Sequence, residues 1–125
     1  MRLQQLVNVQ FQASLKKLME QDMPFKTKYA LKGIVNRFTQ ETTKYDEIRA
    51  EAIKRLGNKK EDGTLDMDEK GNVSINEENG KLFSQELTSL LQTEVEIGSV
   101  KIADLGDKID LNVNDLLNLD GLVVD

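Results

Sequence analysis

The chain has 125 residues, the usual size of one domain, and contains no cysteine and no histidine. These absences exclude disulfides, thiolate nucleophiles, His-assisted catalytic pairs and nearly all zinc-type sites, so we expect a non-enzymatic protein without a cofactor. The net charge is −5, yet residues 1–60 hold 13 Lys or Arg against 6 Asp or Glu, whereas residues 61–125 hold 4 against 16.

The two parts of the chain therefore carry net charges of +7 and −12. This division indicates either two surfaces with different partners or two halves that attract each other, within the fold or between subunits. No apolar run approaches the roughly 20 residues of a membrane helix, and the first residues lack the apolar segment of a signal peptide. We therefore expect a soluble protein that makes no membrane contact.

Two stretches of helical periodicity occupy the first 57 residues. Apolar residues recur every three or four positions from Leu3 to Met19 and predict one amphipathic helix that stops before Pro24. A second periodicity, from Leu31 to Leu56, predicts a longer helix that ends at Gly57 as a left-handed cap. Because the link is short, we expect an antiparallel helical hairpin in residues 1–57. Its core is expected to include Leu15, Leu18, Leu31, Val35 and Phe38.

Most of the basic residues lie on these two predicted helices. Lys and Arg on amphipathic helices chiefly supply solubility and local ion pairs, as at the i, i+4 spacing of Glu51 and Arg55. A solvated basic face is therefore favoured over a nucleic-acid contact. The overall acidity and the lack of aromatic residues between the basic ones also argue against nucleic acid.

Residues 58–76 are rich in Gly and Asp and are predicted to form an acidic β-hairpin or loop. The turn is expected at Lys70-Gly71-Asn72. The apolar positions on its two sides are Leu65, Met67, Val73 and Ile75.

The same stretch resembles a twelve-residue calcium-binding loop. Asp66, Asp68 and Glu77 stand at its first, third and last positions, where Ca²⁺ takes oxygen ligands. Lys70 stands at the fifth position and places a cation where an oxygen ligand is required. No helix leads directly into Asp66. We therefore interpret the stretch as an acidic turn and predict no metal site.

Residues 77–125 are predicted to contain a third helix, a strand and a short helix. An apolar stripe over residues 82–91 predicts the helix, which begins near Asn76 or Asn79. Alternation from Glu94 to Ile97, resumed at Val100, predicts the strand. The short helix is expected to contain Leu116, Leu117 and Leu119, with Asn112 or Asn114 as its cap.

Two carboxylate pairs, Glu94 with Glu96 and Asp104 with Asp107, invite an acid/base interpretation. Alternation places Glu94 and Glu96 on the solvent face of the predicted strand, so we interpret them as solvated residues. The chain contains no nucleophile-elbow motif and no Gly-rich phosphate-binding loop. The sequence thus predicts no catalytic residue.

The predicted fold class is α+β and mainly helical. An N-terminal antiparallel helical hairpin (1–57) is followed by an acidic β-hairpin or loop (58–76), and a third helix, a short strand and a short helix form an acidic half (77–125). We expect these parts to form one domain, residues 1–125.

The chain resembles small uncharacterised proteins of tailed bacteriophages. The segments that carry the resemblance are 23–31, 45–49, 57–63, 68–72, 83–91, 95–97 and an ending with Leu111, Asp115, Leu116 and Leu119. The resemblance brings no activity with it. It implies a viral protein made in the cytoplasm of a bacterial host, with a place in the virion left open.

We therefore expect a non-enzymatic phage protein that acts through protein–protein contact, either with a viral or host protein or by self-association. One alternative is an inhibitor whose acidic surface imitates nucleic acid and occupies a basic groove on a host defence or transcription protein. A second alternative is nucleic-acid binding by the basic helices.

Overall fold

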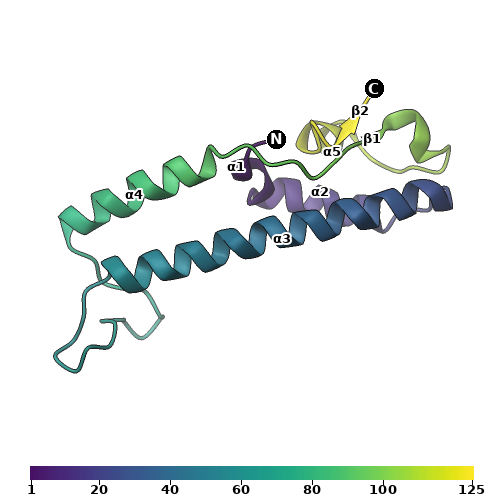
Figure 1. Ribbon diagram of the computed structural model, residues 1–125. Coiled ribbons are helices and arrows are strands. Elements are labelled where there is room, and N and C mark those ends of the chain that lie inside the picture. Colours follow the sequence, from purple (N-terminus) through teal and green to yellow (C-terminus); the bar gives the residue numbers. More distant parts are fainter. The chain divides into compact units, whose positions relative to one another are not determined.

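The computed structural model describes all 125 residues and is mainly helical (Figure 1). It contains five α-helices, one 3-10 helix and a two-stranded sheet. The elements in chain order are α1 (Leu3–Leu6), α2 (Val9–Met19), α3 (Phe25–Leu56), α4 (Glu77–Leu91), β1 (Val100–Lys101), η1 (Ile102–Leu105), α5 (Val113–Asn118) and β2 (Val123–Val124). None of the helices is long and apolar enough to span a bilayer.

The chain divides into two compact units. Unit 1 comprises residues 1–42 and 93–125, and unit 2 comprises residues 43–92. These boundaries differ from the expected divisions at 57/58 and 76/77, because α3 contributes its first part to unit 1 and its last part to unit 2. Whether the chain is a single domain stays a prediction.

The N-terminal helix is interrupted, which corrects the prediction of one helix from Leu3 to Met19. Asn8 has an extended backbone, and its Oδ1 accepts hydrogen bonds from the amides of Gln10 (2.9 Å) and Phe11 (3.1 Å). Asn side chains bond to neighbouring amides and so favour a cap over a helix interior. The apolar periodicity gave no sign of the break, since buried residues continue on both sides of it.

The long helix α3 is confirmed, but the conformation of Gly57 is not the predicted one. Gly57 is absent from the glycines with positive φ. A Cβ at this position would lie 2.7 Å from the Ile53 carbonyl oxygen and 2.7 Å from Val73 Cγ1. Glycine is therefore required at the end of α3 by close packing against the following loop, and not by a left-handed cap.

Two contacts join α2 to the first part of α3. The rings of Phe11 and Phe38 lie 6.0 Å apart, and Lys28 Nζ donates to the carbonyl oxygens of Met19 and Gln21, each at 2.9 Å. Both have the order that an antiparallel pair requires, although the full hairpin arrangement stays a prediction. Ile34 is buried in the core, whereas Phe38 is only half-buried.

The sheet corrects the β-structure expected from the sequence. Its two strands are parallel, with Val100 opposite Val123 and Lys101 opposite Val124, and they belong to no hairpin. Residues 95–97 form no regular strand, although Val95 N–H donates to the Met1 carbonyl at 2.7 Å. The pairing brings the C-terminal segment to the core of unit 1. The buried side chains that this core takes from outside α1, α2 and α3 include Ile97, Leu105, Leu119 and Leu122.

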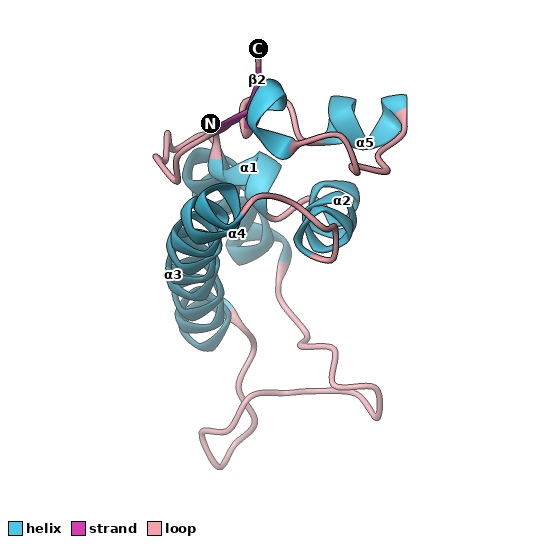
Figure 2. Ribbon diagram, turned by 90° about the vertical axis from the view of Figure 1, so that its right-hand side faces the viewer, coloured by secondary structure: helices cyan, strands magenta, loops and turns pink.

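The β-hairpin predicted in residues 58–76 is not confirmed. The segment is drawn entirely as loop in Figure 2 and contains only isolated antiparallel bridges, between Lys59 and Leu65 and between Met67 and Val73. A two-stranded hairpin is marginal unless one face packs on other elements. Here the Met67 side chain is half exposed, and the turn at Gly71 (φ +83°) projects into open space.

Candidate functional site

One buried carboxylate ties α2 to α5. Asp115 accepts hydrogen bonds from Lys17 Nζ (2.6 Å), Ser14 Oγ (3.0 Å) and the Asn112 amide (3.2 Å), and its own amide donates to the Asn112 side chain to complete a capping box. The hydrogen bond from Lys17 is the main reason why the pKa of Asp115 lies below its ordinary value, and it raises the pKa of Lys17. Because both carboxylate oxygens are engaged, this cluster is suited to holding the two helices together.

The calcium-loop residues serve the turn and the next helix. Asp68 Oδ1 accepts from the amides of Asn72 and Lys70, both at 2.9 Å, and these bonds, with that of Asn72 foremost, lower the pKa of Asp68. Glu77 lies in the first turn of α4 and pairs loosely with Lys81 at 3.8 Å. No group of three carboxylates is placed to hold a metal ion. The absence of calcium binding stays a prediction.

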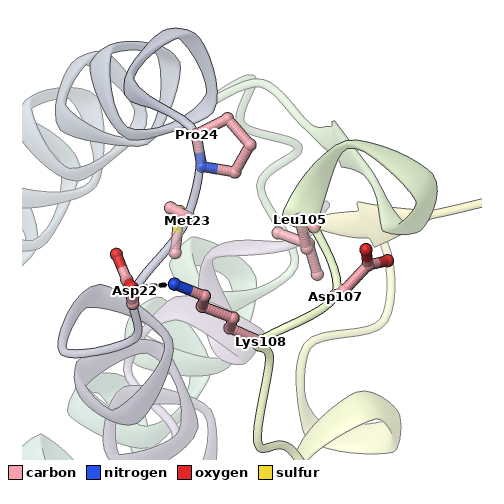
Figure 3. A pocket seen from close by; sticks show the side chains of 7 residues that line it. Asp22, Met23, Pro24, Leu105, Asp107 and Lys108 are labelled. Carbon is pink, nitrogen blue, oxygen red and sulfur yellow. Dashed lines mark ion pairs between the residues drawn. The ribbon is translucent and has the colours of Figure 1, made fainter.

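The carboxylates of the other two pairs considered from the sequence, Glu94 with Glu96 and Asp104 with Asp107, are all exposed. Glu94 contacts the N-terminal amine at 3.3 Å and Arg2 at 3.6 Å. Asp107 lines a hollow of about 380 Å³ beside Pro24 and Leu105 (Figure 3). Asp22 and Lys108 lie on its rim as an ion pair of 3.5 Å, with both side chains more than three-quarters exposed. Exposed pairs of this kind contribute little to stability or chemistry.

Unit 2 fully buries almost none of its apolar residues, most of which are half-buried. No residue of α4 is buried, and in the whole unit only Leu56 and Gly57 are. Two contacts hold α4 to the end of α3: Arg55 with Glu86 at 2.6 Å, and Asn79 Nδ2 with the Leu56 carbonyl at 3.0 Å. The half-buried side chains that form the apolar stripe of α4 are Phe83, Leu87 and Leu90.

A groove in unit 1 runs between α3 and residues 98–101. Two hollows, of about 550 and 620 Å³, share Ala30 and Ser99 in their linings. At one end of the groove the Arg37 side chain reaches from α3 to the opposite segment, where its Nε donates to the Ile97 carbonyl at 2.8 Å. A Cβ on Gly98 (φ +101°) would lie 3.0 Å from Arg37 Nη2, so the guanidinium occupies the space that a side chain there would fill. The cationic residues that line the groove are Lys26, Lys32, Arg37 and Lys101.

Two exposed aromatic residues lie at the start of α3, and one of them, Tyr29, lines the groove. Phe25 and Tyr29 are 93% and 82% exposed, and they flank Lys26 and Lys28 in the chain, with Tyr29 standing between Lys28 and Lys32. The argument that no aromatic residues are interleaved with the basic ones is therefore wrong for the start of α3. The groove itself was missed because Gly33 and Gly98, which lie on its two walls, are far apart in sequence.

Comparison of the chain with protein-family models, with curated proteins and with solved structures finds no match in any of the three.

Proposed function

We propose that the chain is a non-enzymatic protein-interaction module, and that a protein partner covers the apolar stripe of α4. The resemblance described above supports a viral origin, a role in the cytoplasm of a bacterial host, and either a virion or a host-directed task. The observation that carries the proposal is the exposure of unit 2, in which no residue of α4 is buried.

A helix with one apolar face gains stability by packing that face against another element. The stripe of α4 repeats at helical spacing, yet Phe83, Leu87 and Leu90 all stay partly exposed and Leu82 is 43% exposed. Apolar side chains that stay partly exposed along one face of a helix are candidates for a protein contact. Helical docking partners bury such faces through anchors at i, i+4 and i+7.

The distribution of charge favours this function over imitation of nucleic acid. Within unit 1 there are 9 Lys or Arg and 11 Asp or Glu, and within unit 2 there are 8 and 11, so the units carry net charges of only −2 and −3. Asp115 of the C-terminal part pairs with Lys17 of α2. The net charge of −12 on residues 61–125 is thus divided between two units of mixed charge. A protein that imitates nucleic acid needs one densely negative surface, so this division disfavours that alternative.

The test is a substitution in the stripe with a matched control on the opposite side of α4. Leu87→Lys places a charge in the stripe, and Gln85→Lys places the same charge on an exposed position. Sedimentation and affinity capture from host and infected lysates measure association, and thermal melting measures stability.

We expect Leu87→Lys to abolish association with little change in the melting temperature, and Gln85→Lys to change neither. A Leu87→Lys protein that associates normally but melts early would assign the stripe to the core of unit 2 and overturn the proposal.

A further inference from the structure

We propose that the groove between α3 and residues 98–101 binds an extended acidic peptide segment of another protein, which adds as a strand beside Ser99. This groove belongs to unit 1, and the stripe of the proposed function belongs to unit 2, so the two proposals can fail separately.

The lining of the groove is strongly positive. Lys26, Lys32, Arg37 and Lys101 line it, and Asp104 is the one carboxylate among its lining residues. None of the four cations is in an ion pair, whereas Lys17, Arg55 and Lys108 are. The protein as a whole has a net charge of −5, but salt screens distant charges more than near ones. An anionic ligand in the groove would therefore interact mainly with these four cations.

The α3 wall of the groove lets a main chain approach closely at Ala30. Lys26, Ala30, Gly33 and Arg37 are spaced by four, three and four residues and so form one line along α3. Ala30 is small, whereas the Arg37 guanidinium lies over Gly33, with Nη1 3.6 Å from where a Cβ of residue 33 would stand. A ligand that lies along it meets a shallow surface at Ala30, with Lys26 on one side and the Arg37 guanidinium on the other.

The opposite wall offers an unpaired main chain. Val100 N–H donates to the Leu122 carbonyl and thereby faces β2. Because successive amides of an extended chain point to opposite edges, the amide and carbonyl of Ser99 face away from β2. The main chain of Ser99 forms no hydrogen bond within the protein, and Ser99 lines both hollows. This one-residue edge offers one donor and one acceptor with which the main chain of an extended peptide can pair.

The acidic segments of this chain lack a free edge of their own, which points to another protein as the source. In residues 61–69 the Asp66 amide donates to Asn58, and the Asp66 carbonyl accepts from Ser74. The C-terminal strand β2 is already paired with β1. A nucleic acid is disfavoured because its phosphate backbone has no amide that could donate to the Ser99 carbonyl.

The test measures binding of synthetic peptides to the full-length protein by fluorescence anisotropy. The main probe is a labelled hexapeptide that alternates glutamate and valine, capped at both ends. Comparison probes are the same peptide with lysine for glutamate, the acidic peptide with alternate amides N-methylated, a peptide of residues 61–69, and hexathymidylate.

We expect saturable binding of the acidic peptide and of none of the other unmodified probes. Its affinity should fall about tenfold when the amides on the peptide edge that pairs with Ser99 are N-methylated. It should also fall about tenfold in the Lys26→Glu/Lys101→Glu protein. The matched control is Lys16→Glu/Lys70→Glu, which changes the net charge equally at exposed residues outside the groove and should bind normally.

Each of the other outcomes overturns part of the proposal. Two N-methylated peptides are possible, one methylated at the odd-numbered amides and one at the even-numbered amides. If both bind as tightly as the unmethylated acidic peptide, strand addition is excluded. Tighter binding of hexathymidylate would make the groove a nucleic-acid site, and equally tight binding of residues 61–69 would make the occupant a second copy. No binding of any probe would refute the groove as a peptide site.

Discussion

At the scale of single residues, Phe11 is the aromatic anchor of unit 1. It is 1% exposed and contacts Phe38, which is only half-buried. We expect Phe11→Ala to lower the free energy of unfolding by about 3–5 kcal/mol, and Phe38→Ala to lower it by less, because less surface leaves water at position 38. Urea unfolding of both variants measures this. A larger loss for Phe38→Ala would place the centre of the core on α3.

Asp115 makes stability depend on pH. Its pKa is lowered in the folded protein, so its contribution is present above the ordinary Asp pKa of about 3.9 and is lost as the pH falls through the folded value. The pKa of Lys17 is raised, so the Lys17 contribution is present below about 10.4 and is lost as the pH rises above it.

We therefore expect Asp115→Asn to lower the melting temperature at pH 7, with a difference from the wild type that shrinks as the pH falls below about 4. Thermal melts between pH 3 and pH 8 measure the difference, and Asp107→Asn is the control at an exposed carboxylate. A difference that is constant over this range would mean that the pair with Lys17 contributes nothing.

At the scale of elements, the sequence predicts helices better than their breaks and pairings. Helix α3 and the cap of α5 at Asn112 follow from local periodicity and cap residues. The break at Asn8 was hidden because the apolar stripe continues through it. The parallel pairing of Val100 with Val123 depends on a contact distant in sequence, for which neither strand carries a local signal.

The break between α1 and α2 gives a direct test of the Asn8 cap. Asn8→Ala removes the side-chain acceptor and should cost about 0.5–2 kcal/mol of unfolding free energy, whereas Asn8→Asp keeps an acceptor and should cost little. Chemical denaturation of the two variants measures both values. Equal stability of the Ala and Asp variants would show that the cap contributes nothing.

The loop between α3 and α4 should not bind calcium. Its Asp68 carboxylate is occupied by main-chain amides, and Lys70 stands at the fifth ligand position. Calorimetric titration with Ca²⁺ is expected to give no saturable heat, and thermal melting no shift. A micromolar dissociation constant that Glu77→Gln abolishes would contradict the interpretation of the loop as a turn.

At the scale of the whole molecule, the basic and acidic parts of the sequence are mixed within each of the two units, so neither unit carries a large net charge. Basic α2 and the acidic C-terminal segment share unit 1, which leaves that unit nearly neutral. The candidate surfaces are therefore local features, a cationic groove in unit 1 and an apolar stripe in unit 2. Neither could be predicted from net charge, because each depends on which residues the fold leaves uncovered.

The central claim is that α4 presents an apolar stripe for a partner, and amide hydrogen exchange tests it most directly. Helices without buried contacts open at low free energy, whereas core helices exchange near the global limit. On dilute, monomeric protein we predict that the amides of α4 exchange at least about tenfold faster than those of α2, and that they become protected when a partner or assembly covers the stripe. Amides of α4 that are as protected as those of α2 in the monomer would contradict the account.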